Sequence, residues 1–246
     1  MKIVSFLLLL TIVASSGSAQ MKHGRDKYDK ANMMRHLPSI TRSLGGSIQS
    51  FNGLNGRVAN LPQYKQLKDY AGTLGLGWMT EMNRVVSAAG VTIGSSMSGH
   101  RDEKSSTIRY IGFNADIGYD VLKSEKISLY PLVGLGFQAY QAVFFKDNSA
   151  VNFDGVLMSP SVQNSITPVK FKNEFVVYRL GAGASFKAPK CPSTSIGLQA
   201  GYTGSFRKND WKTNYGQALG NSPNDRISQF YFSLMLITKP WMRMGK

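Results

Sequence analysis

Hydrophobic and polar residues alternate along most of the chain after residue 42. In the stretch 110–121, YIGFNADIGYDV, every second residue is apolar, and the residues between are mainly polar or glycine. A period of two is typical of a β-strand whose two faces meet different surroundings. The same pattern predicts eight strands, at about residues 43–51, 74–83, 90–98, 110–121, 129–141, 176–186, 195–206 and 229–237.

The segments between these strands alternate in length. Short connections are expected near residues 83–84, 122–126 and 187–194, and longer ones at about residues 52–71, 99–105, 146–173 and 208–225. Outer-membrane barrels have an even number of strands, short periplasmic turns and longer extracellular loops. We therefore predict an all-β fold, an eight-stranded antiparallel transmembrane up-and-down β-barrel. Its apolar face would contact lipid, because a sheet in hydrocarbon must close on itself to pair its backbone groups.

A soluble lipocalin-like carrier in the periplasm is an alternative with the same strand pattern. It would need an apolar interior and a polar exterior. The glycine, asparagine and aspartate residues that share one face of the predicted strands argue against this inverted arrangement.

Short glycine motifs recur within the predicted strands: GLGW at residues 75–78, GLGF at 134–137 and GAGAS at 181–185. With the apolar N-terminus and the eight alternating strands, they make the sequence resemble the small outer-membrane β-barrel proteins abundant in Bacteroidota, a PorT-like group. More distantly the chain resembles the OmpX- and OmpA-type barrels. The resemblance covers about residues 43–240, and it implies that the N-terminal segment and the short turns lie in the periplasm.

The stretch PLVGLGFQAY, residues 131–140, contains the spacing G-x-G-x-x-A that opens many dinucleotide-binding folds. That motif functions only where a strand stops, the glycines turn and a helix begins. Here the alternation continues through Gly134 and Gly136, and no helix start follows. We interpret both glycines as inward positions kept small where a narrow barrel wall curves.

The first 19 residues have the features of a signal peptide. Lys2 precedes an apolar run that is short for a bilayer span, and small residues end at Ala19. We divide the chain into a signal peptide (1–19), a basic periplasmic segment (20–42), a barrel (43–240) and a short basic C-terminal tail (241–246). The expected location is the cell outer membrane.

The chain is strongly basic, with a formal net charge of +15. Such a charge suggests nucleic acid as a partner, but export excludes that reading. We expect contacts with outer-membrane lipid and lipopolysaccharide, and with a protein partner in the envelope. The segment 20–42 holds six Lys or Arg against two Asp. It is either a solvated basic rim or a periplasmic interaction site formed by Lys22, Arg25, Lys27 and Lys30.

Four charged residues fall on the predicted inner face: Glu81, Asp116, Asp120 and Arg179. The interior of an eight-stranded barrel is just wide enough for side chains to fill it. Because unpaired buried charge is costly, we expect these residues to form an ion-pair network that plugs the lumen. The alternative is a narrow, gated pore.

Candidate chemistry is otherwise sparse. Ser98 and His100, in MSGHRDE, form a nucleophile–base pair only if the fold brings them together; they define a lipid A-modifying enzyme as the alternative function. No metal-ligand spacing occurs, and the lone Cys191 has no partner for a disulfide. We predict no catalytic residues, metal or cofactor.

In the first long loop, residues 61–70 (LPQYKQLKDY) predict a short helix that starts near Pro62. It would either cap the barrel mouth or bind a partner. The overall prediction is a non-enzymatic outer-membrane barrel that acts as a structural or interaction component of the cell envelope, through its outer loops or its basic periplasmic segment.

Overall fold

The computed structural model describes residues 38–100, 103–122, 124, 126–188 and 191–239. The predicted signal peptide, the residues Lys22, Arg25, Lys27 and Lys30, and the C-terminal tail lie outside the described residues. Within the described residues, no helix has the length and apolar character needed to cross a bilayer.

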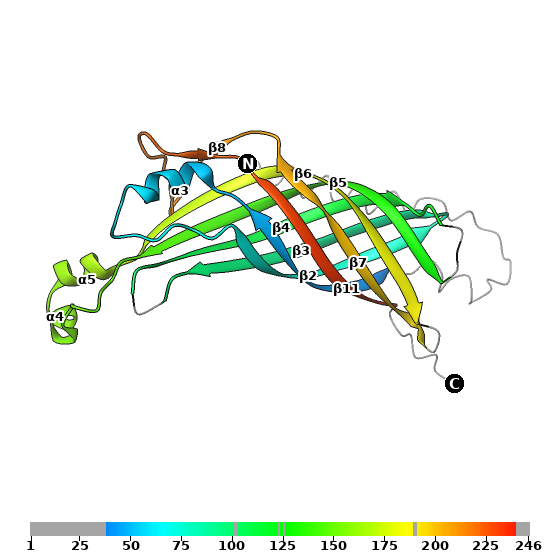
Figure 1. The fold of residues 1–246 in the computed structure, drawn as a ribbon, viewed down its shortest axis with the longest axis horizontal. Coiled ribbons are helices and arrows are strands. Elements are labelled where there is room, and N and C mark those ends of the chain that lie inside the picture. The colour runs from blue at the N-terminus through cyan, green and yellow to red at the C-terminus, as the bar shows by residue number, and fades with distance from the viewer. Residues whose placement is uncertain (1–37, 101–102, 123, 125, 189–190, 240–246) are drawn as a thin grey trace, which may run out of the picture. The chain divides into compact units, whose positions relative to one another are not determined.

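Eight long antiparallel strands form a closed barrel in the described part of the chain (Figure 1). They are β1 (Ser39–Gln49), β2 (Tyr70–Met82), β3 (Val85–Ser98), β4 (Ser105–Tyr119), β5 (Ile127–Phe145), β6 (Val169–Ala188), β7 (Cys191–Ser205) and β11 (Ser228–Thr238). Each strand pairs with its neighbours in this order, and the pairing of β1 with β11 closes the sheet. The predicted fold class is therefore confirmed.

Some strands are longer than the alternation predicts. β1 begins at Ser39 rather than Ser43, and β3 begins at Val85 rather than Gly90. β5 and β6 run over 19 and 20 residues. The end of β5 escapes the period-two pattern because Val143 and Phe144 are both buried, although they point to opposite faces.

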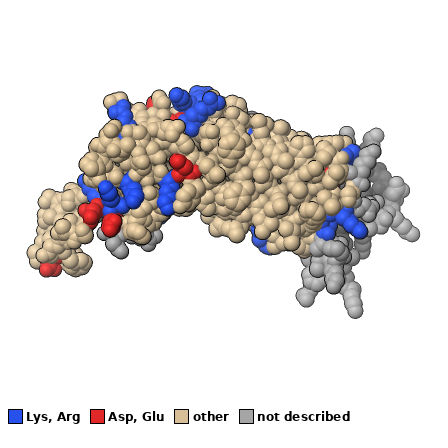
Figure 2. Space-filling view, in the orientation of Figure 1, with Lys and Arg blue, Asp and Glu red and all other residues tan. Residues whose placement is uncertain are grey.

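The outer surface of the barrel is apolar between its two ends. Leu76, Leu198 and Phe230 lie on the face predicted to be apolar, and they are 61%, 59% and 62% exposed. In Figure 2 the barrel surface to the right of centre carries few Lys, Arg, Asp or Glu side chains, whereas charged residues gather over the loop end on the left and at the turn end on the right. Such a surface is costly in water, at roughly 25 cal/mol per Å², but it matches hydrocarbon. It is the apolar band of a membrane barrel.

Aromatic side chains mark the borders of this band. Tyr178, Tyr202, Phe206 and Phe230 form one group of contacting rings on the outer face, with centroids 5.2 to 6.2 Å apart. Near the short turns, the guanidinium of Arg84 lies 4.8 Å from the centroid of an outer tyrosine ring, Tyr119. Aromatic girdles at both interfaces are typical of outer-membrane barrels.

Successive connections lie at opposite ends of the barrel, because successive strands run antiparallel. Three of the four connections at the loop end are long, but the predicted long loop between β3 and β4 (99–104) is no longer than the β4–β5 turn (120–126). The β2–β3 turn consists of Asn83 and Arg84, both at positive φ (51° and 71°), as in a two-residue hairpin turn. The loop end carries helices α3 (Asn52–Ala59), α4 (Phe153–Met158) and α5 (Pro160–Ile166), and short strands β8 (Asn209–Asp210), β9 (Lys212–Thr213) and β10 (Asn224–Asp225).

The helix predicted at residues 61–70 is wrong. The helix of the first loop is α3, at Asn52–Ala59, and residues 61–69 form turns and irregular chain. Proline at a first helical position is only a local signal, whereas α3 is held by a residue from a distant loop, described below. Leu67 is nevertheless buried in the core at the barrel mouth, so this part of the loop does belong to a cap.

Candidate functional site

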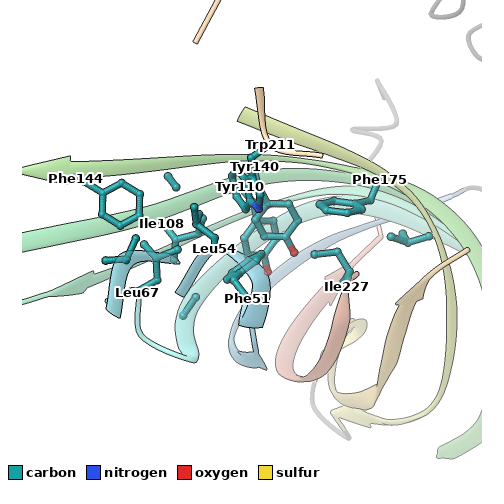
Figure 3. Packing of buried hydrophobic residues seen from close by; sticks show 14 residues of the cluster. Phe51, Leu54, Leu67, Ile108, Tyr110, Tyr140, Phe144, Phe175, Trp211 and Ile227 are labelled. Carbon is teal, nitrogen blue, oxygen red and sulfur yellow. The ribbon is translucent and has the colours of Figure 1, made fainter. Parts of the chain in front are cut away.

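The loop end of the lumen is filled by an aromatic cap. Side chains from the barrel wall and from two loops converge there (Figure 3). The cluster contains Phe51, Leu54, Val58, Leu67, Ala71, Ile108, Tyr110, Tyr140, Ala142, Phe144, Phe175, Val177, Trp211 and Ile227. The ring of Phe51 lies at its centre, with centroid distances of 5.2 Å to Tyr140 and 5.8 Å to Trp211. Edge-to-face contacts of this kind add to the free energy gained by burial.

Asp225 ties the two loops of the aromatic cap together. Its carboxylate accepts hydrogen bonds from the backbone N–H groups of Gly53 (2.6 Å) and Leu54 (3.0 Å), in the first turn of α3. It also accepts one from the indole Nε1–H of Trp211, at 2.7 Å. A carboxylate suits a helix N-terminus because the unpaired N–H groups and the helix dipole both favour negative charge. We call this arrangement the Asp225 clasp.

Position 53 requires glycine for the Asp225 clasp to form. A Cβ at Gly53 would collide with the backbone carbonyl of Asn224 and lie 2.9 Å from Asp225 Oδ1. The clasp also has an outer support, since Arg57 Nη2 donates to Asn221 Oδ1 at 2.8 Å. The first and last long loops are therefore joined as one layer over the mouth.

Beneath the aromatic cap lies a layer of amide and phenol groups. Tyr140 Oη is within hydrogen-bonding distance of Gln49 Oε1 (3.1 Å) and Gln138 Oε1 (2.9 Å). Gln138 Nε2 donates to Gln229 Oε1 at 3.1 Å, and Gln229 Nε2 donates to the oxygen of Tyr110 at 3.2 Å. Long uncharged side chains thus cross the lumen and link strands on its opposite walls.

Deeper in the lumen, a salt bridge lies in a cavity of about 110 Å³. Arg179 Nη1 donates to Asp116 Oδ2 at 2.6 Å, and Asn114 Nδ2 donates to the same oxygen at 2.8 Å. The guanidinium also lies 4.6 Å from the ring centroid of Tyr231. Asp116 Oδ1 rests against Gly134, where a Cβ would collide with it. The glycine of the G-x-G-x-x-A stretch therefore makes room for an internal charge.

The structure brings together two of the four inward charges named from the sequence, Asp116 and Arg179. Glu81 is instead exposed at the end of β2, beside the β2–β3 turn. Asp120 is buried, but its Oδ1 accepts from the backbone N–H groups of Leu122 (3.1 Å) and Leu129 (3.0 Å). Asp120 thus shapes the short turn between β4 and β5. The lumen holds one ion pair among these four residues rather than a network of them.

Ser98 and His100 are not joined by a hydrogen bond in the described part of the chain. Ser98 is buried at the end of β3, whereas the imidazole of His100 is exposed. No group of three side chains that could ligate a metal occurs among the described residues. At the turn end of the lumen, Val86, Tyr130 and Leu132 form a second buried cluster.

The aromatic cap was missed by sequence reasoning because its members sit on the face read as polar. Tyr110 and Tyr140 fall on that face in the alternation, and Val177 interrupts it. A concentration of large apolar residues at the loop-side ends of the inner faces is the signal that could have revealed the cap.

No family model matches the chain, and no curated protein shows significant similarity to it. Three similar solved structures are the attachment invasion locus protein Ail of Yersinia pestis in complex with sucrose octasulfate, Neisserial surface protein A, and a major outer membrane protein from Thermus thermophilus. Their identities to this chain are 15%, 11% and 10%, with TM-scores of 0.48, 0.47 and 0.46. Each match covers 82% of this chain, and 97%, 97% and 100% of the other chain.

Similarity at this level concerns the fold alone. The closed eight-stranded barrel, the apolar outer band and the aromatic girdles are this chain's own features, and together they identify an outer-membrane β-barrel protein. Its location is accordingly the cell outer membrane.

Proposed function

We propose that the protein is a non-enzymatic interaction component of the cell envelope, which works through a rigid loop surface while its lumen stays closed. The observation that carries the proposal is the Asp225 clasp. It joins the first and last long loops and holds the aromatic cap in the mouth of the barrel. A loop layer with a buried core of its own is better suited to present a fixed surface than to open for transport.

The composition of the lumen supports this reading over the narrow pore. Phe51, Tyr140 and Trp211 are at most 2% exposed, so the loop-side entrance is packed with apolar rings. The cavity around Asp116 and Arg179 lies between this cap and the cluster of Val86, Tyr130 and Leu132. An ion would have to displace side chains at both ends to pass.

The β5–β6 hairpin offers an exposed apolar surface to a partner. Its tip carries α4 and α5, with Phe153, Leu157 and Met158 exposed by 73%, 65% and 83%. A contiguous patch of exposed apolar side chains often marks an interaction site, whereas single exposed apolar residues scattered over a surface do not. We infer a protein partner, which the apolar side chains of α4 would contact.

The basic periplasmic segment is a second proposed contact, through Lys22, Arg25, Lys27 and Lys30. Membership of the Bacteroidota barrels also stays a prediction, resting on the recurrent glycine motifs. The lipid A-modifying alternative has no geometric support in the described residues, because His100 is exposed, Ser98 is buried and no hydrogen bond joins them.

Two experiments test the proposal. A photo-crosslinking amino acid at Leu157 should capture one envelope protein in intact cells, whereas the same group at Tyr215, which is 91% exposed in another loop, should not. The substitution Met158→Asp should abolish the Leu157 cross-link. Equal labelling at both sites, or none at Leu157, would contradict an interaction surface on α4.

The second experiment addresses pore and enzyme functions directly. Purified barrel in planar bilayers should show no conductance steps, and Phe51→Ala alone should introduce none, because Val86, Tyr130 and Leu132 still fill the turn end of the lumen. Stepwise currents through the unmodified protein would favour the pore. Lipid A mass spectra from a deletion strain should match the parent strain, and a difference would favour the enzyme.

A further inference from the structure

A groove of about 740 Å³ runs along the outer wall of the barrel, across β2 to β6 and toward the loop end. Leu74, Ile93 and Ile111 form its apolar floor, together with the short side chain of Ala139. The wall is recessed at Gly72, where even an added Cβ would have no neighbour within 4 Å. The groove therefore faces the space that lipid occupies.

The strand register places a basic row immediately on the loop side of this apolar floor. Leu74, Ile93, Ile111 and Ala139 are aligned as one row of partners on adjacent strands, and the row ends on β6 at Glu174, the partner of Ala139. The next outward row, two residues further along each strand, contains Ser95, Arg109, Gln141 and Lys172. Lys172 in turn pairs with Lys212 of β9, which extends the row. Since side chains alternate along a strand, both rows face outward.

The cations of this row have no carboxylate partner within the described residues. The salt bridge that occurs among the described residues joins Arg179 and Asp116 inside the lumen, away from this row. Arg109, Lys172 and Lys212 are exposed, and Glu174 is the carboxylate that lines the groove. The groove thus combines an apolar floor with a net positive rim.

This arrangement matches an amphiphile with an anionic head. The apolar row marks hydrocarbon depth, and the basic row begins where the apolar band ends, at the depth of lipid headgroups on the loop side. Arg109 and Lys172 flank Gln141, so their strands lie roughly 10 Å apart across β5. A guanidinium binds phosphate through paired hydrogen bonds, and an ammonium acts as a point charge.

We propose that the groove is a binding site for a phosphorylated glycolipid of the outer leaflet. One acyl chain lies on the floor formed by Ile93, Ile111 and Ala139, and the phosphates contact Arg109 and Lys172. The site lies on the barrel wall, so it is separate from the proposed loop function and does not depend on it.

Native mass spectrometry of the folded full-length barrel in detergent tests the site. The probes are bisphosphorylated lipid A, the same lipid after removal of both phosphates, and inorganic phosphate. Each cation near an anionic headgroup contributes roughly fivefold in affinity. We therefore expect the phosphorylated lipid to bind at least about tenfold more tightly than its phosphate-free form, with no binding of inorganic phosphate.

Two variants and a matched control locate the site. Arg109→Gln with Lys172→Gln should remove the preference for phosphorylated lipid, whereas Lys187→Gln, an exposed cation at the turn end of β6, should keep it. Ala139→Phe fills the floor and should weaken both lipids about equally. Heat-modifiable gel mobility shows whether each variant is folded.

Three outcomes would overturn the proposal. The unmodified protein could bind both lipids equally, the Lys187 variant could lose as much affinity as the double variant, or Ala139→Phe could leave binding unchanged. The first comparison needs no variant, so it decides the question even if a substitution prevents folding.

Discussion

The Asp225 clasp can be tested by removing its carboxylate. In Asp225→Ala, three hydrogen-bond donors lose their acceptor: the N–H groups of Gly53 and Leu54, and the indole N–H of Trp211. Leu54 and Trp211 are 3% and 1% exposed, so water does not replace the lost bonds without opening the cap. At about 1 kcal/mol for each lost acceptor, the low end of the expected range, the closed cap loses about 3 kcal/mol. The strands are untouched, and the loss is confined to the loop layer.

Hydrogen exchange of the protein in lipid nanodiscs measures this loss. A destabilisation of about 3 kcal/mol corresponds to roughly 100-fold faster exchange for amides protected by the closed cap. We expect this acceleration for the α3 amides, including the Asn55 N–H that donates to the carbonyl of Phe51. Asp225→Asn keeps one carbonyl oxygen and should show a smaller acceleration.

A matched control is Asp210→Asn, because Asp210 lies opposite Asn224 in the β8–β10 pair and is exposed. Its exchange should match that of the unmodified protein. If Asp225→Ala changes the exchange of α3 by less than about threefold, the clasp does not hold the aromatic cap. Faster exchange throughout the barrel strands would show that the cap does not open as a local unit, separately from the barrel.

Three further substitutions examine the lumen and the wall, with unfolding in detergent and denaturant as the common readout. Arg179→Ala should lower the free energy of unfolding by about 3–5 kcal/mol, because it leaves Asp116 buried and unpaired. The double variant with Asp116→Asn should recover most of that loss. Equal stability of the single and double variants would contradict a buried pair. Gly134→Ala should cost about 1–3 kcal/mol through its collision with Asp116 Oδ1, while Gly72→Ala, which meets no neighbour, should be close to neutral. Leu76→Arg should cost about 2–4 kcal/mol by placing a charge in the apolar band, and a smaller loss in lipid than in detergent would argue against lipid contact at that residue.

The strand count and the direction of each face could be predicted because they are local properties, whereas the alternation of loop lengths holds only in part, since the connection 99–104 is no longer than the turn 120–126. A side chain that contacts lipid must be apolar, and its neighbours in sequence point the other way, so the exposed Leu76 and Leu198 are visible in the alternation itself. The glycines of GLGF could be assigned to the wall for the same reason. In these stretches the surroundings of each side chain, lipid or lumen, determine whether the residue is apolar or polar.

The interior could be predicted only in part. The pairing of Asp116 with Arg179 joins residues 63 apart in sequence, and it follows from the register of β4, β5 and β6. In the alternation, Glu81 and Asp120 fall on the same inner face as Asp116, but both lie near the turn end. There Glu81 is exposed to solvent, and Asp120 accepts hydrogen bonds from backbone N–H groups. A residue's place in the period-two alternation gives the side of the wall on which it lies, but it does not give the residue's neighbours.

The sequence alone thus determined that this chain forms a membrane wall, because alternation is a response to lipid on one side. Tertiary structure decided what the wall encloses. Asp225 reaches the N-terminus of α3 across 171 residues of chain, and the same contact places α3 at Asn52–Ala59 rather than after Pro62. The cap depends on closure of the barrel, which brings the first and last loops together, and no local pattern records that proximity.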